Sequence, residues 1–84
     1  MTKKKLIEKD ILSYTVIFEP ASEGGFVVHV PTLPGCHTQG DNLDAAYKMA
    51  EDAIYGYIKT LRDLKEEIPF ESANSIVAKI AVRA

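Results

Sequence analysis

Two histidines are the first candidates for chemistry, because imidazole is a common metal ligand and titrates near neutral pH. His29 and His37 lie on consecutive strand-like segments, and a hairpin centred near Leu33 would place them opposite each other on one sheet face. A structural zinc site takes four protein ligands and a catalytic site usually three. No third ligand has a spacing that points at this pair, so we expect no metal and no other cofactor. A metal-dependent hydrolase using the two histidines is kept as an alternative hypothesis.

The other candidate arrangements, a cysteine nucleophile and paired carboxylates, give less support for catalysis than the two histidines do. Cys36 precedes His37 directly, but neighbouring strand residues point to opposite faces, so the thiol and the imidazole cannot readily meet. Cys36 is therefore expected to be a small buried thiol. The carboxylates of the second half belong to the solvent side or the end of a predicted helix: Glu51, Asp52, Asp63, Glu66 and Glu67. The sequence predicts a protein that is not an enzyme.

Three short strands should come first in the chain. Runs of β-branched and aromatic residues predict strands over Ser13–Glu19, Phe26–Val30 and Cys36–Gln39. Gly24-Gly25 separates the first two, and Pro34-Gly35 suits the central positions of a type II turn between the second and third. Short turns of this kind join antiparallel strands.

A long helix and a last strand follow. Apolar residues recur every three or four positions over Asn42–Glu67, which is typical of an amphipathic helix. Asp41 is placed to cap its first turn, and Pro69 should end it. The alternating run Ile76–Val82 predicts a final strand.

This order of elements predicts an α+β fold in which three antiparallel strands, one long helix and a fourth strand form two layers. A single helix must cover one face of the sheet, and its crossover most simply places the last strand parallel to the first, giving a sheet order of 3-2-1-4. We expect a single domain over residues 1–84, with residues 1–12 as an N-terminal extension.

The sheet face opposite the helix is the candidate binding surface. Strand alternation places an apolar centre and a polar rim on it, a composition typical of partner-binding sites. The candidate partner-binding residues are Ile17, Val27, His29, His37, Gln39 and Lys79. The alternative is an ordinary exposed sheet with scattered valines.

Composition limits the partners and the compartment. Ten basic and twelve acidic residues among 84 give a net charge of −2, and apart from Lys3–Lys5 there is no basic stripe, so direct nucleic-acid binding is not expected. The single cysteine and a charged start without an apolar run indicate a cytoplasmic protein, and no segment is long and apolar enough for a membrane span. A chain this short has a small core, which favours a homo-oligomer, a dimer or a tetramer.

Three sequence features together resemble the HicB antitoxin family. They are Gly24-Gly25-Phe26-Val27-Val28, then the run from Val30 to Asp41 with its Leu-Pro-Gly-Cys turn and Thr-Gln-Gly-Asp end, and the helix opening Leu43-Asp44-Ala45-Ala46. The similarity extends from about Tyr14 to Pro69.

The resemblance implies a partial RNase H-like fold and an antitoxin that binds and neutralises a HicA-type toxin, a small basic mRNA interferase. It does not imply ribonuclease H activity, because the centre of the first strand, Thr15 to Phe18, lacks the acidic residues that hold divalent metal in such enzymes. Many family members also carry a DNA-binding segment after this domain, whereas this sequence stops at Ala84, so operator binding by this chain alone is not expected. An orphan oligomeric binding or regulatory domain without a toxin partner is the alternative.

Overall fold

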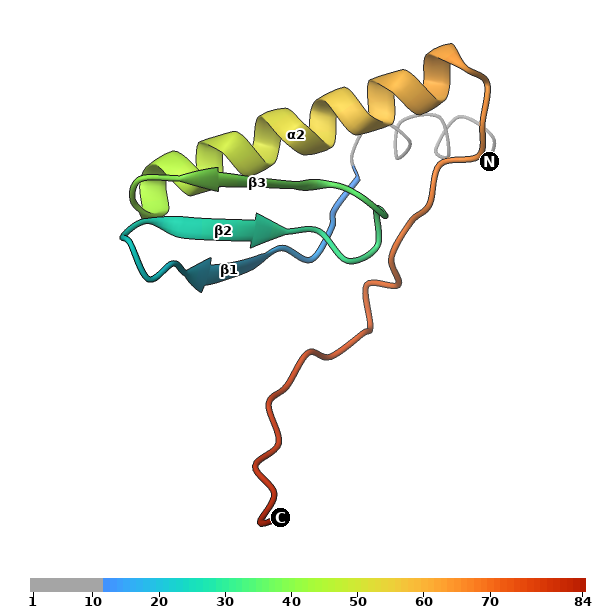
Figure 1. Cartoon of the computed structure of the whole chain (residues 1–84). Coiled ribbons are helices and arrows are strands. Elements are labelled where there is room, and N and C mark those ends of the chain that lie inside the picture. The colour runs from blue at the N-terminus through green and yellow to red at the C-terminus, as the bar shows by residue number, and fades with distance from the viewer. Residues whose placement is uncertain (1–11) are drawn as a thin grey trace.

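A computed structural model describes residues 12–84 as three strands followed by one helix. The strands are β1 (Ile17–Pro20), β2 (Phe26–His29) and β3 (His37–Gly40), and the helix is α2 (Leu43–Asp63). The strands form an antiparallel sheet in the order β1-β2-β3, and α2 crosses one of its faces (Figure 1). The predicted α+β architecture of three antiparallel strands and a long helix is confirmed. Most of the predicted N-terminal extension, residues 1–11, lies outside the described residues.

Both turns of the sheet form where the sequence places them. The β1–β2 turn is closed by the amide of Ala21, which donates to the carbonyl of Gly25 over 2.9 Å. In the β2–β3 connection the amide of Cys36 donates to the carbonyl of Leu33 over 2.9 Å, and Gly35 has a φ of 80°. Proline followed by a residue of positive φ inside such a bond is a type II turn, as predicted for Pro34-Gly35.

The two ends of α2 differ from the prediction. Asn42, and not Asp41, caps the helix: its backbone is extended, and its side-chain oxygen accepts a bond of 2.8 Å from the amide of Ala45. At the other end Lys65 takes a left-handed φ of 59°, with its amide bonded to the Arg62 carbonyl and that of Glu66 to the Leu61 carbonyl. This is a Schellman motif, so the helix ends at Asp63, four residues before the predicted Glu67.

The core lies between the sheet and the helix. Small side chains bring α2 close to the sheet, since Val28 packs against Ala46 and Ala50. Further along, Ile58 packs against the β2–β3 connection. The buried residues there are Val30, Leu33 and Cys36, of which Leu33 is fully buried. Strand alternation turns one set of side chains toward the helix, and these residues pack into this core: Tyr14, Val16, Phe18, Phe26, Val28 and Val30.

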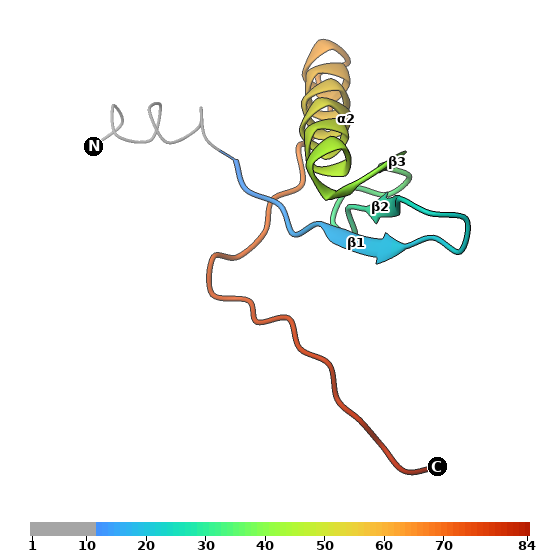
Figure 2. The ribbon, with the colours of Figure 1, turned by 90° about the vertical axis from the view of Figure 1, so that its left-hand side faces the viewer.

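The predicted fourth strand is not formed in this chain. Ile76–Val82 has no strand pairing, and the segment runs away from the sheet (Figures 1 and 2). A turn at Ser72–Ser75, in which the Ser75 amide donates to the Ser72 carbonyl over 3.3 Å, lies between the helix and this segment. The described sheet therefore ends at β1 and has the order 3-2-1 without a fourth member.

No helix within residues 12–84 combines the length and the apolar composition that crossing a membrane requires.

Candidate partner-binding surface

The open face of the sheet carries two rows of side chains that cross all three strands. The strand register aligns Ile17 with His29 and His29 with His37, which forms the first row. All three residues of this row are exposed, and Ile17 is 39% exposed. The cross-strand histidine pair predicted from the sequence is confirmed.

The second row lies one pair further along the hairpin. Val27 sits between Glu19 on β1 and Gln39 on β3. Val27 is half-buried, and its two neighbours are exposed. Five of the six candidate residues are thus brought together on one face, with an apolar pair, Ile17 and Val27, among polar side chains.

Lys79 is the candidate that the structure does not bring to this face. It lies in the segment after the Ser72–Ser75 turn, which has no strand pairing and runs away from the sheet (Figure 1). Its predicted place depended on a fourth strand beside β1, and that strand is not formed here.

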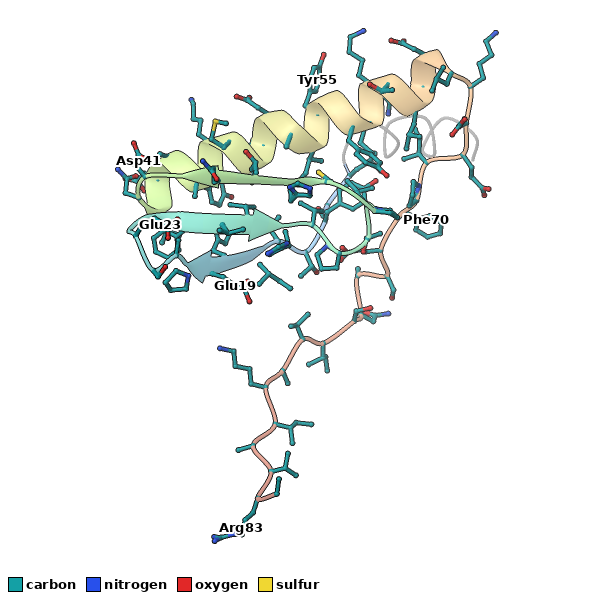
Figure 3. All side chains as sticks on the ribbon, in the orientation of Figure 1. Glu19, Glu23, Asp41, Tyr55, Phe70 and Arg83 are labelled. Carbon is teal, nitrogen blue, oxygen red and sulfur yellow. The ribbon has the colours of Figure 1, made fainter. Side chains whose placement is uncertain are left out.

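Glu19 belongs to the surface but was not among the candidates. One of its carboxylate oxygens, Oε1, lies 3.3 Å from Nε2 of His29, so the two side chains form an ion pair when the imidazole is protonated. Glu19 projects from β1 on the open side of the sheet (Figure 3). Strand alternation alone predicts this position, because Glu19 is two residues from Ile17 and therefore points to the same side of the sheet.

The chemistry available on this face is limited. Among residues 12–84 no three histidine, cysteine or acidic side chains are grouped so that they could hold a metal ion. Cys36 lies on the opposite side of the sheet, 7% exposed, and burial raises the pKa of its thiol. A raised pKa disfavours the thiolate, which is the nucleophilic form. The arrangement therefore suits binding better than covalent catalysis.

Glu71, in the segment that follows the helix, fastens the chain beside Thr15, just before β1. Glu71 Oε2 accepts bonds of 2.7 Å from the Thr15 amide and from the Thr32 hydroxyl, and Oε1 accepts one of 2.7 Å from the Thr15 hydroxyl. The bond from the Thr15 amide, followed by those from Thr32 and Thr15 hydroxyls, lowers the pKa of Glu71. Nearby, the Tyr14 hydroxyl donates to the Pro69 carbonyl. No sequence pattern marked Glu71, because its partners are 39 and 56 residues away.

These features define a small α+β domain with an open sheet face suited to binding a partner. A family model described as "HicB_like antitoxin of bacterial toxin-antitoxin system" matches residues 14–82. The chain belongs to this HicB-like antitoxin family. The resemblance noted in the sequence is therefore confirmed, and membership of an antitoxin family favours a role other than catalysis.

Two relatives that match most of the chain are small proteins of similar length, and a third is a longer protein. The UPF0150 protein Ta0767 of Thermoplasma acidophilum is 42% identical over 65 residues, covering 77% of this chain and 94% of that protein. The UPF0150 protein ssr1765 of Synechocystis is 35% identical over 74 residues, covering 88% and 91%. Antitoxin HicB 1 of Photorhabdus laumondii is 38% identical over 58 residues, which cover 69% of this chain but 37% of that longer protein.

Proposed function

We propose that this chain binds and neutralises a HicA-type mRNA interferase toxin through the open face of its sheet. Family membership supports a toxin partner. The observation that carries the choice of surface is the pair of side-chain rows, Ile17-His29-His37 and Glu19-Val27-Gln39, which no element of residues 12–84 covers. A toxin bound there would have its RNA-binding or catalytic surface blocked by a rigid sheet.

The chemistry of this face fits a basic RNA-binding partner. Ile17 and Val27 offer a small apolar centre, which is the part of an interface that contributes most affinity. Glu19 offers a carboxylate at the edge of that centre, and the whole chain has a net charge of −2. Charge complementarity with a basic toxin increases the association rate and selects against acidic partners.

The proposal is tested with the short basic protein expected from the neighbouring reading frame. Coexpression of the two should relieve the growth arrest that the toxin alone causes, and the two proteins should copurify. Val27→Lys and Glu19→Lys place positive charge against a basic partner. Each should weaken binding by about 100-fold or more, since like charges across an interface cost several kcal/mol and about 1.4 kcal/mol is tenfold. Affinity is measured by calorimetry with a catalytically inactive toxin.

The matched control is Tyr55→Lys, which introduces the same charge on the back of α2, where Tyr55 is 70% exposed (Figure 3). This variant should bind like the wild type. Equal binding by Val27→Lys, Glu19→Lys and the wild type would show that the toxin uses another surface. A neighbouring protein that neither copurifies nor arrests growth would favour the orphan binding domain instead.

A further inference from the structure

The segment after the Ser72–Ser75 turn exposes large apolar side chains. Ile76, Val77, Ile80 and Val82 are 90%, 70%, 84% and 84% exposed. The segment extends away from the sheet and the helix (Figure 2). Contiguous exposed apolar residues on a soluble domain indicate an interaction site. Residues Ile76–Val82 are called the tail below.

The way the tail leaves the domain directs it away from its own sheet. The three bonds of Glu71 fasten the chain beside Thr15, just before β1. The Ser72–Ser75 turn follows at once, with the Asn74 amide also donating to the Ser72 hydroxyl over 3.1 Å. In this structure Val77 of the tail lines a hollow together with Thr15 and Ile17, but the tail does not pair with its own β1.

β1 is an open edge of the described sheet. The Ala21 amide donates to the Gly25 carbonyl, so the backbone groups of Ala21 point toward β2. Backbone groups alternate in direction along a strand, so those of Val16 and Phe18 point outward, away from β2. An edge with outward amides and carbonyls is a template for another strand. β1 therefore offers backbone partners to an incoming extended segment.

A groove of about 250 Å³ runs between this edge and the helix, on the inner side of the sheet. Its walls are Tyr14, Val16 and Phe18 from the β1 side and Tyr47, Ala50 and Ile54 from α2. The rings of Phe18 and Tyr47 are stacked, with centroids 6.2 Å apart, and Tyr47 is still largely exposed. A strand added to β1 would place every second side chain over this groove, and in the tail these residues are Ile76, Ala78, Ile80 and Val82.

The charges of the two surfaces are complementary. The charged side chains from Ile76 to the end of the described chain are both basic, Lys79 and Arg83. Acidic residues flank the β1 edge: Glu19 on the strand, Glu23 in the turn after it, and Glu51 at the groove. Figure 3 shows Glu19 and Glu23 on the β1 side of the domain and Arg83 at the far end of the chain. Attraction between them requires a second copy, because in one copy they lie apart.

We propose that the tail of one copy pairs with the β1 edge of a second copy, whose tail pairs with the first in return. A seven-residue extended segment of this composition exposes roughly 1,000 Å². If each of two tails buries half of this area against an equal area of the receiving edge, about 2,000 Å² is removed from solvent, which is the range of stable dimers. The exchange completes a four-stranded sheet in each half of a two-fold symmetric dimer.

The first experiment measures the oligomeric state of the full chain without any toxin, so its result is independent of the proposed function. Sedimentation equilibrium should show a dimer. Ile80→Asp places a charge over the groove and should weaken dimerisation by about 100-fold or more, since burial of an unpaired carboxylate is strongly unfavourable. The control Tyr55→Asp makes a comparable change on the exposed back of α2 and should leave the dimer intact.

The second experiment distinguishes pairing between copies from pairing within one copy. Dimers are assembled from ¹⁵N-labelled and ¹³C-labelled chains, and filtered nuclear Overhauser spectra should show contacts between tail amides of one copy and β1 of the other. A monomeric wild type overturns the proposal, as does a dimer that Ile80→Asp leaves unchanged. Contacts confined to a single copy, or a tail that pairs only when a toxin is added, also overturn it.

Discussion

The junction between β3 and α2 gives the sharpest test of the packing, because it brings two backbones into contact at Gly40. A Cβ added to Gly40 would lie 2.4 Å from the Ala46 nitrogen, 2.5 Å from the Ala46 Cα and 2.8 Å from the Ala45 carbonyl carbon. Ordinary contacts of this kind are about 3.5 Å or longer, so the backbones must separate by about 1 Å. They are held in place, since the Ala46 amide donates to the Asn42 carbonyl and the Ala45 amide to the Asn42 side chain, each over 2.8 Å.

Gly40→Ala should therefore destabilise the domain by about 2 kcal/mol. Overpacking costs about 1–3 kcal/mol and a disturbed N-cap about 1 kcal/mol, against a gain of about 0.4–1 kcal/mol from the stiffer unfolded chain. Each kcal/mol lowers the Tm of a domain of this size by about 4–8 °C, so a loss of about 8–16 °C is expected by circular dichroism.

The control for Gly40→Ala is the glycine inside the helix. Beyond the neighbouring backbone of α2 itself, no atom lies within 4 Å of a Cβ added to Gly56, which is exposed. Gly56→Ala should therefore stabilise the domain by about 1 kcal/mol. Both variants are compared at one protein concentration, since self-association would make the Tm depend on concentration. A Gly40→Ala variant within 1 kcal/mol or so of the wild type would refute the close backbone contact.

Two further predictions concern the helix end and the Glu71 bonds. Lys65→Gly should raise the free energy of unfolding by about 1 kcal/mol, because glycine adopts the left-handed φ of 59° without strain. Lys48→Gly inside α2 should lower it by about 0.7 kcal/mol. Urea unfolding measures both variants, and changes of the same sign would contradict the Schellman geometry. Glu71→Gln should destabilise the domain at neutral pH. Because folding lowers the pKa of Glu71 below its ordinary 4.5, its contribution is present above that pH and is lost as the pH falls through the folded pKa. The difference between wild type and variant should therefore shrink on acidification in urea titrations at several pH values, and a constant difference would contradict the role of the carboxylate.

Local patterns predicted most of the fold. Alternation placed Val28 and Val30 inside and Val27 and His29 outside, and Pro34-Gly35 marked the turn that pairs His29 with His37. These features depend on neighbours within a few residues, so the sequence contains their signal.

The features that were missed depend on more distant or less marked contacts. Lys65 adopts the left-handed conformation that glycine usually takes after a helix, so the sequence has no glycine there to indicate where the helix ends. Glu71 acts through Thr15 and Thr32, which only the folded chain brings near. The tail has the composition of a strand, but composition does not say which edge it pairs with, and in this structure it does not pair with its own β1.

The proposed strand exchange and the proposed toxin site use different parts of β1. Alternation directs Ile17 and Glu19 to the open face, while Val16 and Phe18 turn their side chains to the groove and their backbone groups to the edge. A tail added at the edge would therefore widen the open face by one strand and leave its two rows uncovered. It would also bring Lys79 of the second copy beside that face, since Lys79 alternates with the groove-facing Ala78 and Ile80. The sixth candidate residue would then reach the binding surface from the partner chain, and Lys79→Glu should change toxin affinity only in chains that still dimerise.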